Sequence, residues 1–162
     1  MPTVKEVLND TKKRLKEQGI DTYSLDSSLL VSEVTGLTKI QLVTHDRDEV
    51  TEEQINRLEN LVKERLKNKP MQYILGHCEF MGLDFKVTEN TLIPRGDTEN
   101  IVEEVIATIE NSGYNTVLDM CTGTGAIAIS VAHYTKAKVT ASDISSKALE
   151  VARENAKILN AD

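Results

Sequence analysis

Hydrophobic side chains in residues 1–70 recur at the spacing of amphipathic α-helices. Four helices are predicted there, with Thr3, Ser24, Thr38 and Thr51 as their N-caps. Thr3 with Glu6, and Thr51 with Gln54, have the spacing of a capping box. The main apolar positions are Val4, Val7, Leu8 and Leu15; Leu25, Leu29, Leu30 and Val34; and Ile55, Leu58, Val62 and Leu66. Residues 1–70 are therefore expected to form a small helical cap or recognition domain.

The hydrophobic spacing shortens after Pro70. Phe80, Leu83, Phe85 and Val87 are interleaved with polar residues, and Gly82 offers a turn between them. This pattern predicts a β-hairpin over residues 78–87, within a linker that spans residues 71–92.

From residue 93 onward, helical and strand patterns alternate. The predicted order is a helix near Asp97–Glu99 that ends at Gly113, a strand at 116–119, a helix at 125–133, a strand at 138–142 and a helix at 145–160. Such alternation is typical of a parallel sheet in the α/β class. Residues 93–162 are therefore expected to begin a Rossmann-like domain.

Two parallel strands and one connecting helix cannot cover both faces of a parallel sheet. Val117, Leu118, Val139 and Ala141 should therefore lie against partly bare surfaces. We expect the chain to be the N-terminal part of a longer protein, with a truncated sheet. A short protein that completes its sheet by dimerising is the alternative.

Composition narrows the classes of partner. The 162 residues are 40% hydrophobic and 28% charged, with a net charge of -7, which fits a soluble globular protein. An acidic chain is a poor match for a nucleic-acid backbone, so a protein or small-molecule partner is favoured. The sequence contains neither a membrane-spanning run nor a signal-peptide pattern, and Cys78 and Cys121 are too few for a disulfide framework. A cytoplasmic protein is expected.

The sequence gives little support for a metal site or a reactive thiol. His45, His77 and His133 lack paired ligand spacing. Cys121 is interpreted as a small loop residue because nothing nearby in sequence would lower the pKa of its thiol.

The strongest chemical signal is a loop bounded by two acids. Asp119 ends a predicted strand, the loop runs from Cys121 to Gly125, and Asp143 ends the next strand. Glycines let the backbone approach a ligand closely and direct free N–H groups at it. A carboxylate on the next strand can accept both hydroxyls of a ribose. This arrangement predicts a site for an adenosine-containing cofactor.

Two classes of cofactor fit this loop. Gly123, Gly125 and Ala128 match the dinucleotide fingerprint, and Asp143 follows Gly125 by 18 residues, so a dehydrogenase is possible on spacing alone. However, Asp119 precedes the glycines and would repel a pyrophosphate. The pattern resembles motif I of S-adenosylmethionine-dependent methyltransferases, which we favour.

Simple capping roles are the structural alternative for the loop residues. Asp119 could close the strand, and Thr122 or Thr124 could cap the following helix. The combination of two strand-end acids and an intervening glycine loop argues against capping as the whole explanation.

Beyond the loop, the chain resembles the HemK/PrmC-type glutamine methyltransferases along its whole length. The resemblance rests on 72–76 (Gln-Tyr-Ile-Leu-Gly), on 92–99 with its Pro-Arg-x-Asp-Thr-Glu signature, and on 26–30 and 36–38 in the helical part. Two residues depart from the family. Gly96 stands where proline is common, and Cys121 stands where the first glycine is common. We infer that position 121 does not need a positive φ.

The resemblance implies S-adenosyl-L-methionine as cofactor and the glutamine of the Gly-Gly-Gln motif in peptide chain release factors as substrate. Asp119 would brace the loop and Asp143 would hold the ribose hydroxyls. The implied cofactor-binding residues are Asp119, Cys121, Thr122, Gly123, Thr124, Gly125 and Asp143. Arg95 and Thr98 would line the cleft, and the helical domain would hold the release factor.

The resemblance also implies an Asn-Pro-Pro-Tyr motif that holds the substrate amide. Pro2, Pro70 and Pro94 are the only prolines of the chain, and none is adjacent to another. We therefore predict no catalytic residue in these 162 residues and no activity from them alone. The alternatives are a methyltransferase for another protein amide or a nucleic-acid base, and a non-catalytic module that binds release factors.

Overall fold

The computed structural model describes residues 1–161 and divides the chain into two compact units. We call Met1–Leu75 the helical unit and Gly76–Asp162 the sheet unit. Each is described by itself.

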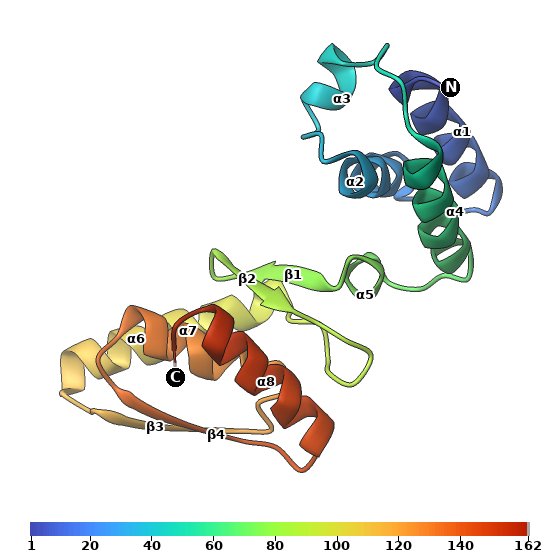
Figure 1. Cartoon of the computed structure of the whole chain (residues 1–162). Helices are drawn as coiled ribbons and strands as arrows, with labels where there is room; N and C mark the ends of the chain where they lie inside the picture. Colours follow the sequence, from blue (N-terminus) through green and yellow to red (C-terminus); the bar gives the residue numbers. More distant parts are fainter. Residues whose placement is uncertain (162) are drawn as a thin grey trace. The chain divides into compact units, whose positions relative to one another are not determined.

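The helical unit contains five helices (Figure 1). They are α1 (Val4–Glu17), α2 (Tyr23–Thr35), α3 (Gln41–Thr44), α4 (Glu52–Leu66) and α5 (Met71–Leu75). Both predicted capping boxes are present, because Thr3 and Thr51 each exchange two hydrogen bonds with the residue three positions later. Leu15, Leu30, Val31 and Val62 are completely buried where α1, α2 and α4 pack together.

The N-terminus of the second helix differs from the prediction. α2 begins at Tyr23, so Ser24 lies inside the helix, and its hydroxyl does not cap the N-terminus. Thr22 precedes the helix, and its hydroxyl donates to Asp26 Oδ2 at 2.8 Å. Leu25, expected on the apolar face, is 49% exposed because the buried face is formed by Asp26, Ser27, Leu30, Val31 and Val34.

Two further predictions are corrected at this level. Thr38 and Gln41 exchange the expected pair of hydrogen bonds, but they close a turn just before α3, whose N-cap is Ile40. The region expected to be a hairpin linker starts as a helix, since residues 71–75 form α5 and Met71 is buried in the helical core.

The sheet unit begins with the predicted hairpin. β1 (His77–Phe80) and β2 (Leu83–Lys86) pair in an antiparallel register that sets Phe80 opposite Leu83. Met81 and Gly82 form the turn with φ values of 52° and 71°. Two successive positive φ angles are typical of the tight turns that match strand twist.

The α/β part of the unit follows the predicted order. A short 3₁₀ turn (Gly96–Thr98) leads into α6 (Glu99–Ser112), and then come β3 (Thr116–Met120), α7 (Ala126–Tyr134), β4 (Lys138–Ser142) and α8 (Ser146–Ile158). β3 and β4 are parallel, and their pairing runs from Thr116 opposite Lys138 to Met120 opposite Ser142. The predicted α/β class with a short parallel sheet is confirmed.

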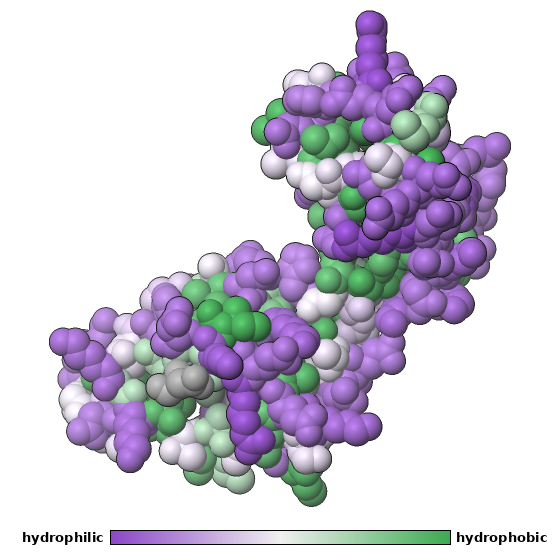
Figure 2. Space-filling model, viewed as in Figure 1, coloured by the Kyte–Doolittle hydropathy of each residue, from purple (hydrophilic) through white to green (hydrophobic). Residues whose placement is uncertain are grey.

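The sheet is covered on one face. Figure 1 shows α6, α7 and α8 on the same side of β3 and β4, and the hairpin contributes Phe80 and Phe85 to the core formed by these helices. On the other face, Leu118 is 60% and Met120 is 70% exposed. In the view of Figure 2, hydrophobic residues lie at the surface of this unit. The prediction of a partly bare sheet is confirmed for Leu118 and Ala141, whereas Val117 and Val139 are half-buried in the core.

No helix within residues 1–161 is both long and apolar enough to cross a membrane.

Candidate functional site

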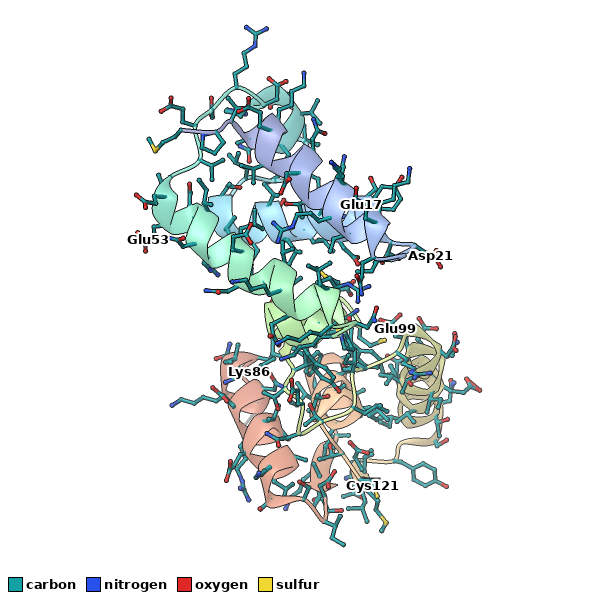
Figure 3. The ribbon with its side chains drawn as sticks, turned by 90° about the vertical axis from the view of Figure 1, so that its right-hand side faces the viewer. Glu17, Asp21, Glu53, Lys86, Glu99 and Cys121 are labelled. Carbon is teal, nitrogen blue, oxygen red and sulfur yellow. The ribbon has the colours of Figure 1, made fainter. Side chains whose placement is uncertain are left out.

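The predicted loop lies where the two parallel strands end. The register places Asp119 opposite Ala141 and Met120 opposite Ser142, so Asp143 follows directly on the neighbouring strand. The N–H of Thr122 donates to Ser142 O at 2.9 Å, which fastens the loop to the end of β4. Cys121, at the start of the loop, is labelled in Figure 3. Strand pairing therefore brings both predicted acids to one loop.

Asp119 is the internal support of the loop. Its side chain is 8% exposed, and its Oδ2 accepts from Thr122 Oγ1 at 2.6 Å and from the N–H of Ala128 at 3.3 Å. The second bond satisfies an N–H in the first turn of α7, where a negative charge is also favourable. One buried carboxylate thus ties β3, the loop and α7 together.

Asp143 holds the loop from the outer side. Its Oδ2 accepts from the N–H of Gly123 at 2.9 Å, and its Oδ1 accepts from the N–H of Ser145 at 2.9 Å. These bonds, first that from Ser145 and then that from Gly123, lower the pKa of the Asp143 carboxyl from its usual value. Asp143 is therefore ionised at neutral pH and can act only as an acceptor.

The two loop glycines face different surroundings. A Cβ at Gly125 would lie 2.8 Å from Ile129 Cδ1 and 3.3 Å from Ala152 Cβ, so this glycine allows α8 to approach the loop. A Cβ at Gly123 would meet nothing within 4 Å. Both have positive φ, at 83° and 56°. The open side of the loop, where a ligand can approach the backbone, is thus at Gly123.

The loop amides are less free than the sequence suggested. The N–H of Gly123 donates to Asp143, and the N–H groups of Thr122 and Gly125 donate to backbone carbonyls within the protein. The prediction of a set of free N–H groups is therefore wrong at these three positions. Carboxylates and carbonyls take up the donors and fix the shape of the loop instead.

The alternative in which Thr122 or Thr124 caps the following helix does not hold. The N-cap of α7 is Gly125, and no side chain caps the helix from that position. The Thr122 hydroxyl is instead donated to Asp119, and Thr124 is 3% exposed. The first turn of α7 receives its carboxylate acceptor from Asp119, outside the helix.

The backbone at position 121 contradicts the inference that a cysteine there needs no positive φ. Cys121 has a φ of 64°, although it is not glycine. The left-handed region costs an ordinary residue about 1–2 kcal/mol, and the packed loop maintains it here. Its side chain is exposed. By contrast, burial, followed by the nearby carboxylates Glu79, Asp84 and Glu99, raises the pKa of the Cys78 thiol.

The Pro-Arg-x-Asp-Thr-Glu segment lies before α6. Arg95 precedes the 3₁₀ turn and Thr98 ends it. In the part of the chain that the structure describes, neither side chain forms a hydrogen bond with the loop. Glu99 has a defined role that the sequence did not indicate. Its Oε1 accepts from the N–H of Met81 at 2.6 Å and so holds the hairpin turn against α6 (Figure 3).

Asn155 on α8 is a residue of the site that was missed. It is completely buried and bonds to the Thr124 carbonyl at 2.9 Å. A signal was available in the sequence, because Asn155 shares the helical spacing of Ala148, Val151 and Ala152. An asparagine on the apolar face of a helix is unfavourable unless its amide finds partners.

Two grooves border the sheet but do not contain the acids. One of 680 Å³ lies along α7, β4 and α8, and one of 470 Å³ lies between α6 and β3. Gly125 lines the first, whereas Asp119 and Asp143 line neither. The two acids therefore lie at the ends of the strands, whereas the grooves run along the edges of the sheet. Among the residues described, no cluster of three His, Cys, Asp or Glu residues could hold a metal ion.

Comparison with known proteins matches both parts of the chain to families. Residues 6–76 match the PrmC N-terminal domain family, and residues 117–162 match a methyltransferase domain family. A release factor glutamine methyltransferase of Clostridium acetobutylicum is 41% identical over 97% of this chain and 55% of its own length. The corresponding protein of Moorella thermoacetica is 40% identical over 97% of this chain and 56% of its own length.

Over nearly its whole length, the chain is similar in sequence to release factor glutamine methyltransferases, and residues 6–76 match the PrmC N-terminal domain family. The resemblance inferred from the Pro-Arg-x-Asp-Thr-Glu signature and the loop is thereby confirmed. A family member of Fusobacterium nucleatum, 41% identical, is likewise matched over 96% of this chain but only 44% of its own. The chain spans about half the length of the relatives that it matches.

Proposed function

We propose that the chain supplies the release factor-binding helices and the S-adenosylmethionine-binding loop of a glutamine methyltransferase. The methyl acceptor would be the side-chain amide of the glutamine in the Gly-Gly-Gln motif of a peptide chain release factor. The relatives named for this activity support the proposal, as does the placement of two carboxylates about one glycine loop.

The observation that carries the cofactor assignment is the contrast between the two acids. Asp119 is buried, and its Oδ2 is bonded to Thr122 and Ala128. Asp143 is half-buried beside the open side of the loop, where its two oxygens accept the N–H groups of Gly123 and Ser145 and its pKa is lowered. An ionised, accessible carboxylate suits the two hydroxyls of a ribose. A Cβ at Gly123 would have no atom within 4 Å, which leaves room for a ligand on that side of the glycine. The residues present therefore fit an adenosine-containing cofactor.

When bound, S-adenosylmethionine supplies an electrophilic methyl group on a sulfonium. Asp119 would keep the loop in shape, Cys121 to Gly125 would lie along the cofactor, and Asp143 would orient its ribose. An amide nitrogen is a weak nucleophile, because its lone pair is delocalised, and it needs acceptors for its N–H groups together with close alignment. The Asn-Pro-Pro-Tyr acceptors expected for this step are not in the 162 residues. We propose that the chain alone binds the cofactor without transferring its methyl group.

Calorimetry with S-adenosylhomocysteine tests the cofactor assignment directly on this chain. Asp143→Asn should weaken binding at least tenfold, because the variant exchanges an ionised acceptor for a neutral amide. Glu150→Gln, on the exposed side of α8, is the matched control and should bind like the parent chain. Equal affinity of all three would contradict the assignment, and binding of a nicotinamide dinucleotide in its place would point to the dehydrogenase alternative.

Methyl transfer is tested separately with labelled cofactor and a release factor. The chain alone should give no methylated glutamine. Turnover by the 162 residues would show that the missing acceptors are supplied in another way.

A further inference from the structure

α8 presents a fully buried amide to the cofactor loop. Asn155 is 0% exposed and lies on the buried face of the helix with Ala148, Val151 and Ala152. Asparagine is a poor residue for a helix interior, and a buried amide is costly unless it is bonded. The side chain therefore needs specific partners to be tolerated at this position.

Its hydrogen bonds join three segments. Oδ1 accepts from the N–H of Lys86 at 2.8 Å, and Nδ2 donates to the Lys86 carbonyl at 3.0 Å and to the Thr124 carbonyl at 2.9 Å. The N–H and the carbonyl of Lys86, at the end of β2, are thus both hydrogen-bonded by one side chain, as they would be by the backbone of a neighbouring strand. Figure 3 shows Lys86 beside α8. One side chain links the hairpin, α8 and the loop.

The bond to the loop fixes a particular peptide group. Asn155 holds the carbonyl of the Thr124–Gly125 peptide, and the N–H of the same peptide donates to Thr122 O at 2.9 Å. Gly125 has a φ of 83°, so the direction of the chain into α7 depends on this peptide. One turn earlier on α8, Ala152 lies against Gly125, where an added Cβ would be 3.3 Å away. α8 therefore holds the loop at two adjacent points.

We infer that Asn155 is a positioning residue for the cofactor loop, which it locks to the hairpin through Lys86. The inference rests on the proposed function only in naming the loop as the cofactor site. Asn155 acts through the Thr124–Gly125 peptide. Without its amide, the Thr124 carbonyl loses a buried partner and the peptide can rotate. Rotation would break the Gly125–Thr122 bond and disturb the neighbouring Gly123, which faces the ligand side.

Residue-resolved amide hydrogen exchange tests this without any ligand. In Asn155→Leu, of similar volume but without hydrogen bonds, the amides of Gly125 and Lys86 should exchange at least tenfold faster. Amides of the β3–β4 ladder should keep their rates, which a general loss of stability would not allow. Glu154→Gln is the matched control, because Glu154 pairs with the same Lys86 through the exposed Nζ. It should leave Gly125 unchanged.

Affinity for S-adenosylhomocysteine supplies the second readout. Asn155→Leu should raise the Kd at least tenfold, and Glu154→Gln should not. If the parent chain does not bind this ligand, the proposed function fails, while the exchange result still decides the positioning role. Unchanged Gly125 exchange in a folded Asn155→Leu would overturn the inference.

A measurement on the unmodified chain covers the case in which that variant does not fold. Both Nδ2 hydrogens of Asn155 are bonded in the structure, so they should exchange far more slowly than those of an exposed asparagine. Exchange at the rate of a free side chain would overturn the inference.

Discussion

The two units of this chain bury their apolar residues to different extents. In the helical unit, α1, α2 and α4 enclose a core in which Leu15, Leu30, Val31 and Val62 have no exposed surface. In the sheet unit, helices cover one face of β3 and β4, while Leu118, Met120 and the following Ile144 are 60%, 70% and 102% exposed. A parallel sheet is normally buried on both faces. The comparison shows that the loop from Cys121 to Gly125 has a defined shape on a sheet whose second face is bare, because Asp119, Asp143 and α8 hold it.

We expect the largest difference between the units when one leucine in each is replaced by alanine and the loss in free energy of unfolding is compared. Leu30→Ala should lower the free energy of unfolding of the helical unit by about 3–4 kcal/mol, because a buried leucine leaves a cavity. Leu118→Ala should change that of the sheet unit by less than about 0.5 kcal/mol, as expected for an exposed position. Urea unfolding followed by amide signals of each unit measures both. Similar losses would remove the contrast between the units.

The stability of the helical unit should also depend on a buried ion pair. Asp26, 3% exposed, accepts from Arg65 Nε at 2.8 Å and from Thr22. Asp26→Ala leaves Arg65 largely buried without its partner and should cost about 3 kcal/mol. Glu33→Ala removes an exposed pair with Arg57 and should cost less than about 1 kcal/mol. Equal effects in thermal unfolding would contradict the distinction.

The sequence predicted the parts of the fold that depend on neighbouring residues. The capping boxes at Thr3 and Thr51, the hairpin and the order of strands and helices all follow from short-range patterns. The pair Asp26–Arg65 joins residues 39 positions apart, and Asn155 reaches Lys86 across 69. Such contacts depend on packing, which no local pattern encodes.

Some features of the candidate site could be predicted from the sequence, and others could not. The strand-end acids and the glycines could be located because strand pairing brings them together. The sequence could not show that Asp143 already accepts the Gly123 N–H, nor that Cys121 adopts a positive φ. Both the hydrogen bond of Asp143 and the φ of Cys121 are set by the packing of the loop. The chemical type of the residue does not determine them.

Within the sheet unit, the two loop glycines should differ in sensitivity. Gly123→Ala should cost about 1 kcal/mol for the left-handed backbone alone. Gly125→Ala should cost about 2–3 kcal/mol, because its Cβ also meets Ile129 and Ala152. Chemical denaturation of both variants checks this order. A larger loss for Gly123→Ala would show that the packing at Gly125 is not what shapes the loop.

Cys121→Gly is expected to stabilise the sheet unit. Removing the side chain relieves the positive φ, and the gain is reduced by the added freedom of glycine in the unfolded chain, leaving about 0.5–1 kcal/mol. Cys121→Ala keeps the Cβ and should remain within about 0.5 kcal/mol of the parent chain. Destabilisation by Cys121→Gly would mean that the thiol side chain packs usefully in the loop.

The smallest effect is the titration of Asp143. Its folded pKa is lowered, so the stabilisation from its bonds to Ser145 and Gly123 is complete above the usual value of about 3.9 and is lost as the pH falls through the lower folded pKa. NMR titration of the Asp143 carboxyl carbon and the Gly123 amide should give a common midpoint below that value. A midpoint at or above it would contradict the hydrogen bonding described.

The central claim is that the loop from Cys121 to Gly125, together with Asp143, binds the nucleoside of S-adenosylmethionine. The most direct test is an NMR titration of the 162-residue chain with S-adenosylhomocysteine. The account predicts that the largest amide shifts occur at Gly123 and at Asp143 and saturate together. Saturable shifts confined to the helical unit, or no shifts at millimolar ligand, would contradict it.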